Sequence, residues 1–334
     1  MINKKVILAT FLISMMVFCT KALAQDDSTH LKGWLRIDHK LRERYEKTNY
    51  DTMYIVRPKE LINLRFRGNF SGTDIRTRER IDGTTIHGHL QADYQNSISV
   101  DIGYCGLTVG LTLNPASLSG KNKDTEFNLN YYDNRFGFDV VYETVKSFRG
   151  HVNYQGERLD LTKRDLNMHM LNVNAYYVFN GKRFSYPAAF DQTYIQKRSA
   201  GSWLAGIAYQ SGRLRSEANE GANLPKTRLY IGYFAVGGGY AYNWVAHRRW
   251  LIHASALPYL IVSNRSNIRI DDERHDTRTN FPDFIISSRL AVVRTFGRYY
   301  AGISGVTTST LIGDNNVMTD FNKWYSQAVF GMRF

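Results

Sequence analysis

Residues 321–334 read FNKWYSQAVFGMRF. Taken in twos from the end, one face of this segment carries Phe334, Met332 and Phe330, and the other face begins with Arg333. An alternation with a period of two is typical of a β-strand that has one apolar face. Because an apolar strand at an open sheet edge promotes aggregation, the segment predicts a closed sheet in which the last strand pairs with the first and no edge remains.

The first residues have the pattern of a secretory signal peptide. Two lysines precede an apolar run over residues 6–18, and the small-x-small sequence Ala22-Leu23-Ala24 follows. The run of about 13 residues is too short for a spanning helix, which needs about 20. Phe18 stands where a lipoprotein signal would need a small residue before Cys19. We therefore expect cleavage after Ala24 and export of the mature chain.

The composition favours many paired strands. The chain has 26 Gly, 6 Pro, 22 Tyr and 18 Phe, and aromatic residues are enriched in strands. Its mean hydropathy is −0.38, and no apolar stretch after residue 24 reaches helix-spanning length. Cys105 is the one cysteine outside the signal, so no intrachain disulfide is expected.

The chain is basic, with a formal net charge of +13. Removal of the signal takes away three lysines and no acid, which leaves 13 − 3 = +10. In an exported protein this excess favours anionic lipid or polysaccharide over nucleic acid as a partner. A solvated basic surface is the alternative.

The body of the chain alternates in the same way as its end. In residues 86–104 the even positions, such as Leu90 and Val100, are apolar, and the odd positions, such as His89 and Asp101, are polar. The same division recurs in segments across the chain, among them 62–67, 107–113, 126–131, 136–143, 171–177 and 234–244. A two-residue period alone does not separate a membrane barrel from a soluble sandwich.

The connections separate these two folds. They alternate between short turns, as at residues 105–106 and 297–298, and longer polar loops, as at residues 73–84, 147–165 and 263–281. Short turns on one rim and long loops on the other are typical of an outer-membrane barrel. Aromatic residues such as Trp244 also gather beside the short turns, where an interfacial girdle belongs. We predict an all-β, transmembrane antiparallel β-barrel of about 12 strands, with 10 to 14 possible.

Three regions follow from this reading. Residues 1–24 form the signal peptide, residues 25–60 an N-terminal periplasmic segment, and residues 61–334 the barrel. Within the second region, residues 33–45 place apolar side chains on one helical stripe, which predicts a short periplasmic helix.

Three stretches carry a resemblance to a known family. They are YDTMYI (residues 50–55), GYCGLTVGL (103–111) and FSYPAAFDQTYIQKRSAGS (184–202), between a signal peptide and a terminal Phe. In this order they resemble the outer-membrane barrel family of Bacteroides-type bacteria labelled domain of unknown function 4421. The resemblance covers nearly the whole mature chain. It implies the fold and an outer-membrane location, but no substrate, activity or catalytic residue.

The alternation also gives candidate functional residues. The candidate lumen-lining residues are Arg65, Arg67, His87, His89, Asp93, Asp101, Asp139 and Arg289. The long connection at residues 180–200 breaks the short-turn rule, and its aromatic content favours burial. We expect it to fold against the periplasmic mouth and narrow the lumen, with Lys197 or Arg198 near Asp139. Its candidate constriction residues are Phe184, Tyr186, Phe190, Tyr194, Lys197 and Arg198.

The terminal strand is the candidate assembly signal. Phe330, Met332 and Phe334 are the residues that we expect the barrel-assembly machinery to read. The other expected partners are outer-membrane lipid and lipopolysaccharide, with no nucleic acid and an unidentified ligand.

Three function classes fit an outer-membrane barrel. A narrow pore and a ligand- or glycan-binding barrel fit the mixed charges of the lumen equally well. A lipid-modifying hydrolase is the alternative, although no serine stands in a nucleophile motif. His87, His89 and Asp93 suggest a metal or acid–base cluster, but lumen-lining polar residues explain them as well. We therefore expect no catalytic residue, metal or cofactor.

Overall fold

The structure, a computed structural model, describes residues 31–334 except for 82–83, 119–123, 155–156, 163–164, 217–226, 248, 266, 271–272, 277–282 and 314–316. The predicted signal peptide, residues 1–24, lies outside the described residues. The chain forms two units, residues 1–47 and residues 48–334.

The first unit contains one described helix, α2 (Leu31–Glu46). It covers the predicted helical stretch 33–45. Ion pairs one turn apart support it, from Arg42 to Asp38 at 2.9 Å and from Lys47 to Glu43 at 3.0 Å. None of the described helices is long and apolar enough to cross a membrane.

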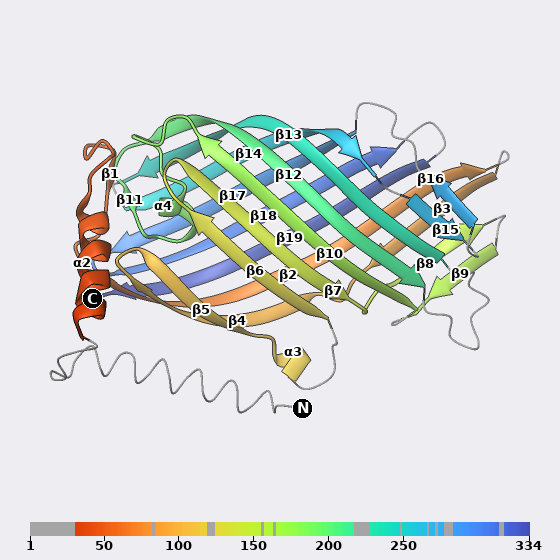
Figure 1. Cartoon of the computed structure of the whole chain (residues 1–334), viewed down its shortest axis with the longest axis horizontal. Coiled ribbons are helices and arrows are strands. Elements are labelled where there is room, and N and C mark those ends of the chain that lie inside the picture. The colour runs from red at the N-terminus through yellow and green to blue at the C-terminus, as the bar shows by residue number, and fades with distance from the viewer. Residues whose placement is uncertain are drawn as a thin grey trace. The chain divides into compact units, whose positions relative to one another are not determined.

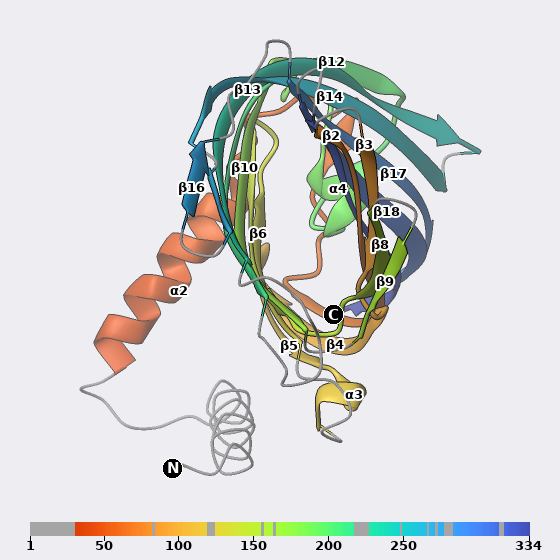
Figure 2. The same ribbon diagram turned by 90° about the vertical axis from the view of Figure 1, so that its right-hand side faces the viewer.

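The second unit is built from antiparallel strands that curl into a barrel wall (Figures 1 and 2). Twelve strands of the described chain follow one another around this wall, in agreement with the predicted number. They are β2 (Ile62–Ile81), β4 (Gln95–Tyr104), β5 (Leu107–Leu113), β6 (Thr125–Tyr132), β7 (Phe136–Val145), β10 (Leu166–Val178), β12 (Ala200–Ser216), β13 (Thr227–Ala246), β14 (Trp250–Asn264), β17 (Phe284–Phe296), β18 (Tyr299–Gly313) and β19 (Val317–Arg333).

The last strand pairs with the first strand of the wall, as the terminal sequence predicts. β19 runs antiparallel to β2 over seventeen residue pairs, from Val317 opposite Glu79 to Arg333 opposite Asn63. The expectation that no edge remains is not met. β5 and β6 are neighbours in the order of the sheet, but the described residues include no pair in register between them.

The two faces of the wall differ as the alternation predicts. The outward face is apolar, with Trp203, Ile303 and Phe330 all exposed. The inward face carries buried polar groups, among them Asp101 and Arg289. An apolar outer band around a polar lumen is the design of a transmembrane barrel, so the predicted fold class is confirmed.

The turns at one end of the barrel are tight. β4 and β5 are joined by Cys105 and Gly106, whose φ angles are 49° and 78°. Two consecutive positive φ angles are typical of a two-residue hairpin turn. Trp244, Trp250, Phe296 and Tyr299 are exposed near this short-turn end. Tyr300 is different, because it faces inward and is fully buried.

Parts of the predicted long loops at the opposite end are strands. β2 continues to Ile81 and pairs with β3 (Thr84–Gln91) inside the predicted loop 73–84. The predicted loops 147–165 and 263–281 likewise contain strand pairs, which are β8 (Arg149–Tyr154) with β9 (Glu157–Leu161), and β15 (Asn267–Ile270) with β16 (Glu273–Asp276). These segments are polar and were therefore expected to be loops. They form strands because backbone N–H and C=O groups need partners whether or not the strand has an apolar face.

Candidate functional site: the loop inserted into the short-turn end

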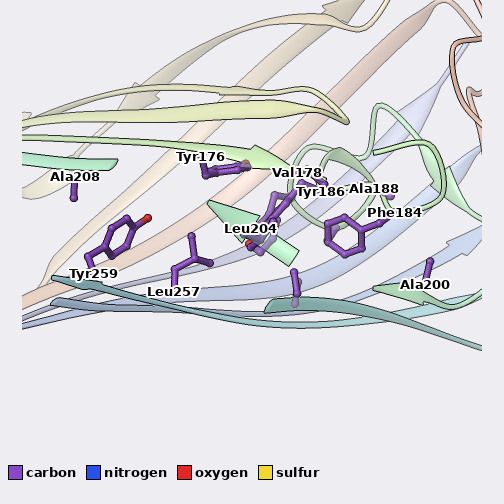
Figure 3. Packing of buried hydrophobic residues seen from close by; sticks show 14 of the residues in the cluster. Tyr176, Val178, Phe184, Tyr186, Ala188, Ala200, Leu204, Ala208, Leu257 and Tyr259 are labelled. Carbon is purple, nitrogen blue, oxygen red and sulfur yellow. The ribbon is translucent and has the colours of Figure 1, made fainter. Parts of the chain in front are cut away.

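The connection between β10 and β12, residues 179–199, enters the barrel and is here called the inserted loop. It contains the short helix α4 (Pro187–Phe190), and Pro187 suits a first helical position because it needs no backbone N–H partner there. α4 lies within the ring of strands (Figure 2). Figure 3 shows Phe184 and Tyr186 among wall residues such as Leu204. Phe184 is 0% exposed and Tyr186 is 1% exposed, which agrees with the predicted burial of this loop.

Three strands of the wall hold the inserted loop by hydrogen bonds. Tyr186 donates its hydroxyl proton to Ser255 Oγ on β14 at 2.8 Å. Arg65 on β2 donates to the carbonyl of Asp191 at 2.8 Å, and Arg333 on β19 donates to the carbonyl of Gln192 at 3.1 Å. Charged donors to buried carbonyls stabilise more than neutral donors do. The loop is therefore fixed from several sides of the barrel.

Gln196 connects the inserted loop to the segment that precedes the barrel. Its side-chain oxygen accepts from the backbone N–H of Ser185 and from Asn243, each at 3.0 Å. Its side-chain nitrogen donates to the carbonyls of Arg183 at 2.6 Å and Tyr54 at 3.3 Å. The strands β1 (Ile55–Val56) and β11 (Ile195–Gln196) also pair here. The segment before the barrel therefore also helps to hold the inserted loop in place.

The side chain of Asp191 is partly buried in the inserted loop. Burial raises its pKa to about 6, and the nearby Arg65 opposes this rise. Thr193 donates to Asp191 Oδ1 through its hydroxyl at 2.8 Å and through its backbone N–H at 3.2 Å. The inserted loop therefore contains a group that titrates near neutral pH.

An arginine lies beneath the aromatic side chains of the loop. Arg289 on β17 forms an ion pair with Asp139 across the lumen. Its guanidinium carbon lies 5.8 Å from the ring centroid of Tyr186 and 5.9 Å from that of Phe190. Cation–π contacts of this kind are strongest where water is excluded. Two of the predicted lumen residues, Asp139 and Arg289, thus form an ion pair next to the aromatic side chains of the inserted loop.

A serine, a histidine and an asparagine form a chain of hydrogen bonds next to the inserted loop, and the direction of each bond can be assigned. Asn243 Nδ2 donates to the carbonyl of Ser185 at 2.8 Å, which leaves Asn243 Oδ1 as the acceptor for His253 Nδ1 at 2.7 Å. Nδ1 then carries the ring proton, so His253 Nε2 accepts from the hydroxyl of Ser255 at 3.1 Å. A nucleophile, a base and an orienting group have this order in hydrolases.

Two other charged clusters line the lumen. Asp101 accepts from Arg65 Nε at 3.1 Å and from Arg67 Nη2 at 2.6 Å, so these three predicted lumen residues lie together. Lys323 donates to Glu143 at 2.6 Å and to Glu126 at 3.4 Å. The lumen therefore contains an internal lattice of ion pairs.

The structure places His87 and His89 away from the lumen, in contrast to the expectation. They are in register with Arg78 and Arg76, on the outward side of β2 that also carries Phe66. Non-strand residues at 92–94 separate β3 from β4, and the inward positions change there from even to odd. The alternation over residues 86–104 therefore does not belong to one strand.

The partners of the other candidates also differ from expectation. His89 contacts Asp74 at 2.6 Å, and Asp93 pairs with Arg149 outside the lumen lattice. Lys197 is exposed and donates to the carbonyl of Thr52 at 3.1 Å. Arg198 is exposed, with its guanidinium 6.0 Å from the ring of Tyr54.

Three other predicted residues have the expected burial or exposure. Tyr194 is buried and accepts from Arg57. In the candidate assembly signal, Phe330 and Phe334 are exposed on the outward face.

The sequence pattern did not single out Asn243, His253 and Ser255 as candidate residues. The spacing of His253 and Ser255 puts both on one face of a strand, which is a signal in the sequence. Asn243 lies on the neighbouring strand, opposite His253 in register. No group of three or more His, Cys, Asp or Glu side chains in the described ranges is placed to hold a metal ion.

The fold and the site define an antiparallel transmembrane β-barrel whose lumen is filled at one end by its own loop. The chain belongs to the family described as Domain of unknown function (DUF4421), which matches residues 49–334. No curated protein matches the sequence.

Several solved barrels are similar to this chain at low identity. The outer membrane protease OmpT of Escherichia coli is 8% identical, with a TM-score of 0.40 and coverage of 86% of this chain and 100% of that chain. The translocator domain of the autotransporter NalP of Neisseria meningitidis is 9% identical, with a TM-score of 0.36 and coverage of 91% and 96%. OprG of Pseudomonas aeruginosa is 10% identical, with a TM-score of 0.29 and coverage of 82% and 97%. These values carry no statement about activity.

Proposed function

We propose that this protein is an exported outer-membrane barrel of a Gram-negative bacterium that rests closed and works by binding a ligand at its long-loop end. The signal-peptide pattern of residues 1–24 and the apolar outer face of the wall support this location. Outer-membrane barrels have short turns on the periplasmic side and longer loops on the outer side. The short turns and long loops of this chain therefore support an orientation with the short-turn end in the periplasm. Outer-membrane lipid and the barrel-assembly machinery are its proposed partners.

The packing of the inserted loop is the observation that supports the proposed closed state of the barrel. Phe184, Tyr186 and α4 pack among inward side chains of the wall in one buried cluster. The cavity beside the loop, lined by residues such as Gln192, Leu251 and Arg333, has a volume of about 20 Å³. A space of this size holds about one water molecule, which supports close packing of the loop against the wall at this place.

A second cluster of buried apolar side chains lies farther along the barrel. Ile75, Met168, Met170 and Phe321 are among its members. Side chains of a barrel of about twelve strands can fill much of its interior, unlike those of the larger porins. Both clusters therefore favour a binding barrel over an open pore.

Single-channel recording of the purified protein in planar bilayers tests this proposal. We expect insertion without a steady ion current. A steady open current from the unmodified, inserted protein would overturn the closed state and restore the narrow pore as the better proposal. Failure of the protein to insert would instead overturn the membrane location.

A lipid-modifying hydrolase is the second candidate, and the Ser255–His253–Asn243 chain favours it. In such a reaction Ser255 Oγ attacks an ester carbonyl carbon and its proton passes to His253 Nε2. The ester C–O bond breaks, and the alcohol leaves with that proton. Water then attacks the acyl-serine, again with His253 as the base, which releases the acid and restores the serine.

The inserted loop covers this serine in the resting state. Tyr186 donates to Ser255 Oγ, and the His253 ring lies 5.0 Å from the ring centroids of both Tyr186 and Phe190. A hydrolase would therefore need the loop to move. Hydrolysis of p-nitrophenyl acyl esters by a Tyr186→Ala, Phe190→Ala variant tests this, with Ser255→Ala in the same background as the control. Equal rates with and without Ser255 would leave the network as an anchor for the loop.

A further inference from the structure

Three arginines lie close together on the outward face near the long-loop end of β12 and β13. Arg213 and Arg215 belong to β12, and Arg228 belongs to β13. Arg215 is directly opposite Arg228 in register, and Arg213 is directly opposite Tyr230. All three arginine side chains are exposed. We call Arg213, Arg215 and Arg228 the arginine triad.

The arginine triad lies above the apolar band of the same two strands. Trp203, Ile207 and Tyr209 are exposed on the same face of β12 as Arg213. Arg213 follows Trp203 by ten residues, a rise of about 33 Å along the strand at about 3.3 Å per residue. With a strand tilt of about 40°, this becomes about 25 Å along the barrel axis, which is the usual height of the lipid-facing band. The arginine triad therefore lies at the level of the lipid head groups.

The arginine triad has no protein counter-charge in the described part of the chain. No ion pair joins Arg213, Arg215 or Arg228 to a described carboxylate, although other exposed arginines such as Arg76 and Arg158 have such partners. Like charges directly opposite on a sheet are destabilising. The backbone register also continues the row from Arg228 to Arg269. An external anion would relieve this repulsion.

The surface around the arginine triad has room for such an anion. A cavity of about 260 Å³ is lined by the three arginines together with Leu214, Leu229, Tyr230 and Asn267. The guanidinium carbon of Arg213 lies 5.9 Å from the ring centroid of Tyr230, and this contact supports the position of the side chain. Guanidinium groups bind phosphate oxygens in a bidentate way that lysine does not match.

We propose that the arginine triad binds the phosphate of a phosphorylated saccharide lipid in the outer leaflet, with the acyl chains against the apolar face below. Charge complementarity and the apolar residues on the same strands favour a lipid over a soluble anion. The proposal rests on the proposed outer-membrane location, with the long-loop end facing outward.

Native mass spectrometry of the purified barrel with bis-phosphorylated lipid A tests this proposal. The test variant is Arg213→Gln, Arg215→Gln, Arg228→Gln. The control variant is Arg76→Gln, Arg149→Gln, Arg158→Gln, which removes the same charge from exposed arginines that have carboxylate partners. We expect the test variant to bind at least about tenfold more weakly, because each arginine near a membrane surface adds a favourable electrostatic contribution. The control should bind like the unmodified protein.

Two further arms identify the ligand chemistry. Dephosphorylated lipid A should bind the unmodified protein as weakly as lipid A binds the test variant. A soluble sulfated polysaccharide without acyl chains should compete poorly. Equal loss of binding in both variants, equal binding of both lipids, or tight binding of the polysaccharide would each overturn the proposal. Heat-modifiable mobility on gels shows whether each variant is folded, and insertion into liposomes tests the membrane location separately.

Discussion

Phe334 and Ile62 exchange two backbone hydrogen bonds across the junction between the last and the first strand of the wall. Phe334 N–H donates to the carbonyl of Ile62 at 2.9 Å, and Ile62 N–H donates to the carbonyl of Phe334 at 3.2 Å. The side chain of Phe334 is exposed on the outward face. The last residue therefore completes the junction with its backbone and meets lipid with its side chain.

Deletion of Phe334 should reduce the yield of folded barrel in the outer membrane. The deletion removes both of these hydrogen bonds and the aromatic side chain that we expect the assembly machinery to read. Immunoblots of membrane fractions with heat-modifiable mobility measure this yield. Phe334→Tyr, which retains the backbone and an aromatic ring, is the control. A normal yield for the deletion would show that this residue is dispensable for assembly.

Val100→Arg should destabilise the barrel in a bilayer. Val100 lies on the outward face, opposite Phe66 in register. Arginine near the bilayer midplane costs about 2–4 kcal/mol in barrels of this kind. Urea unfolding in lipid vesicles measures the free energy of unfolding. If Val100→Arg and Val100→Leu unfolded alike in vesicles, the outward assignment of β4 would be wrong.

Asp101→Asn, one residue away, should also be costly, for a different reason. Asp101 is 0% exposed and pairs with Arg65 and Arg67. Loss of one partner from a buried ion pair costs about 3–5 kcal/mol, because the remaining charge is left uncompensated. Unlike Val100→Arg, this variant should be destabilised in detergent as well as in vesicles. Stability equal to that of the unmodified protein would show that the lumen is wet at this position.

Replacement of residues 184–198 by a Gly-Ser turn should give the barrel a steady ion current. The replacement removes the aromatic side chains that fill the short-turn end. The double variant Tyr186→Ala, Phe190→Ala keeps the loop length and should give a smaller increase in conductance. Lys197→Ala, in the exposed part of the same loop, should leave the barrel silent. Silent bilayers for both folded variants would show that the second buried cluster closes the lumen without the loop.

Acidification should stabilise the inserted loop. The folded-state pKa of Asp191 is raised to about 6 from its ordinary value of 3.8, so the folded loop binds the proton more tightly than the unfolded chain. This stabilisation is fully present below about 3.8 and is lost as the pH rises through about 6. The expected difference between pH 5 and pH 8 is roughly 1 kcal/mol.

Hydrogen exchange of the loop amides, corrected for the intrinsic pH dependence of exchange, measures this difference. Asp191→Asn should remove the pH dependence between pH 5 and pH 8, while Asp51→Asn, near the exposed Arg183, should retain it. A loop that becomes more protected as the pH rises would contradict the sign of the predicted effect.

The two-residue period of the sequence predicted which side chains of the wall point inward and which point outward in most strands. It placed Phe330 and Val100 outward and Asp101 and Arg289 inward, because successive side chains of a strand point to opposite faces. It failed at His87 and His89, because the short interruption at residues 92–94 changes the phase without a strong turn signal. Strand extensions such as β15 and β16 were also missed, because polar strands above an apolar band lack the alternation of hydrophobicity that identifies strands.

The sequence by itself determined that the inserted loop is buried, since its aromatic residues favour burial wherever it folds. Only the tertiary structure decided its partners. Asp139 and Arg289 are 150 residues apart, and a lumen of mixed charges allows many pairings until the order and register of the strands are set. The Ser255–His253–Asn243 chain and the arginine triad likewise depend on register across neighbouring strands. Side-chain period is a local property of the chain, whereas cross-strand neighbours are set by how the whole sheet closes.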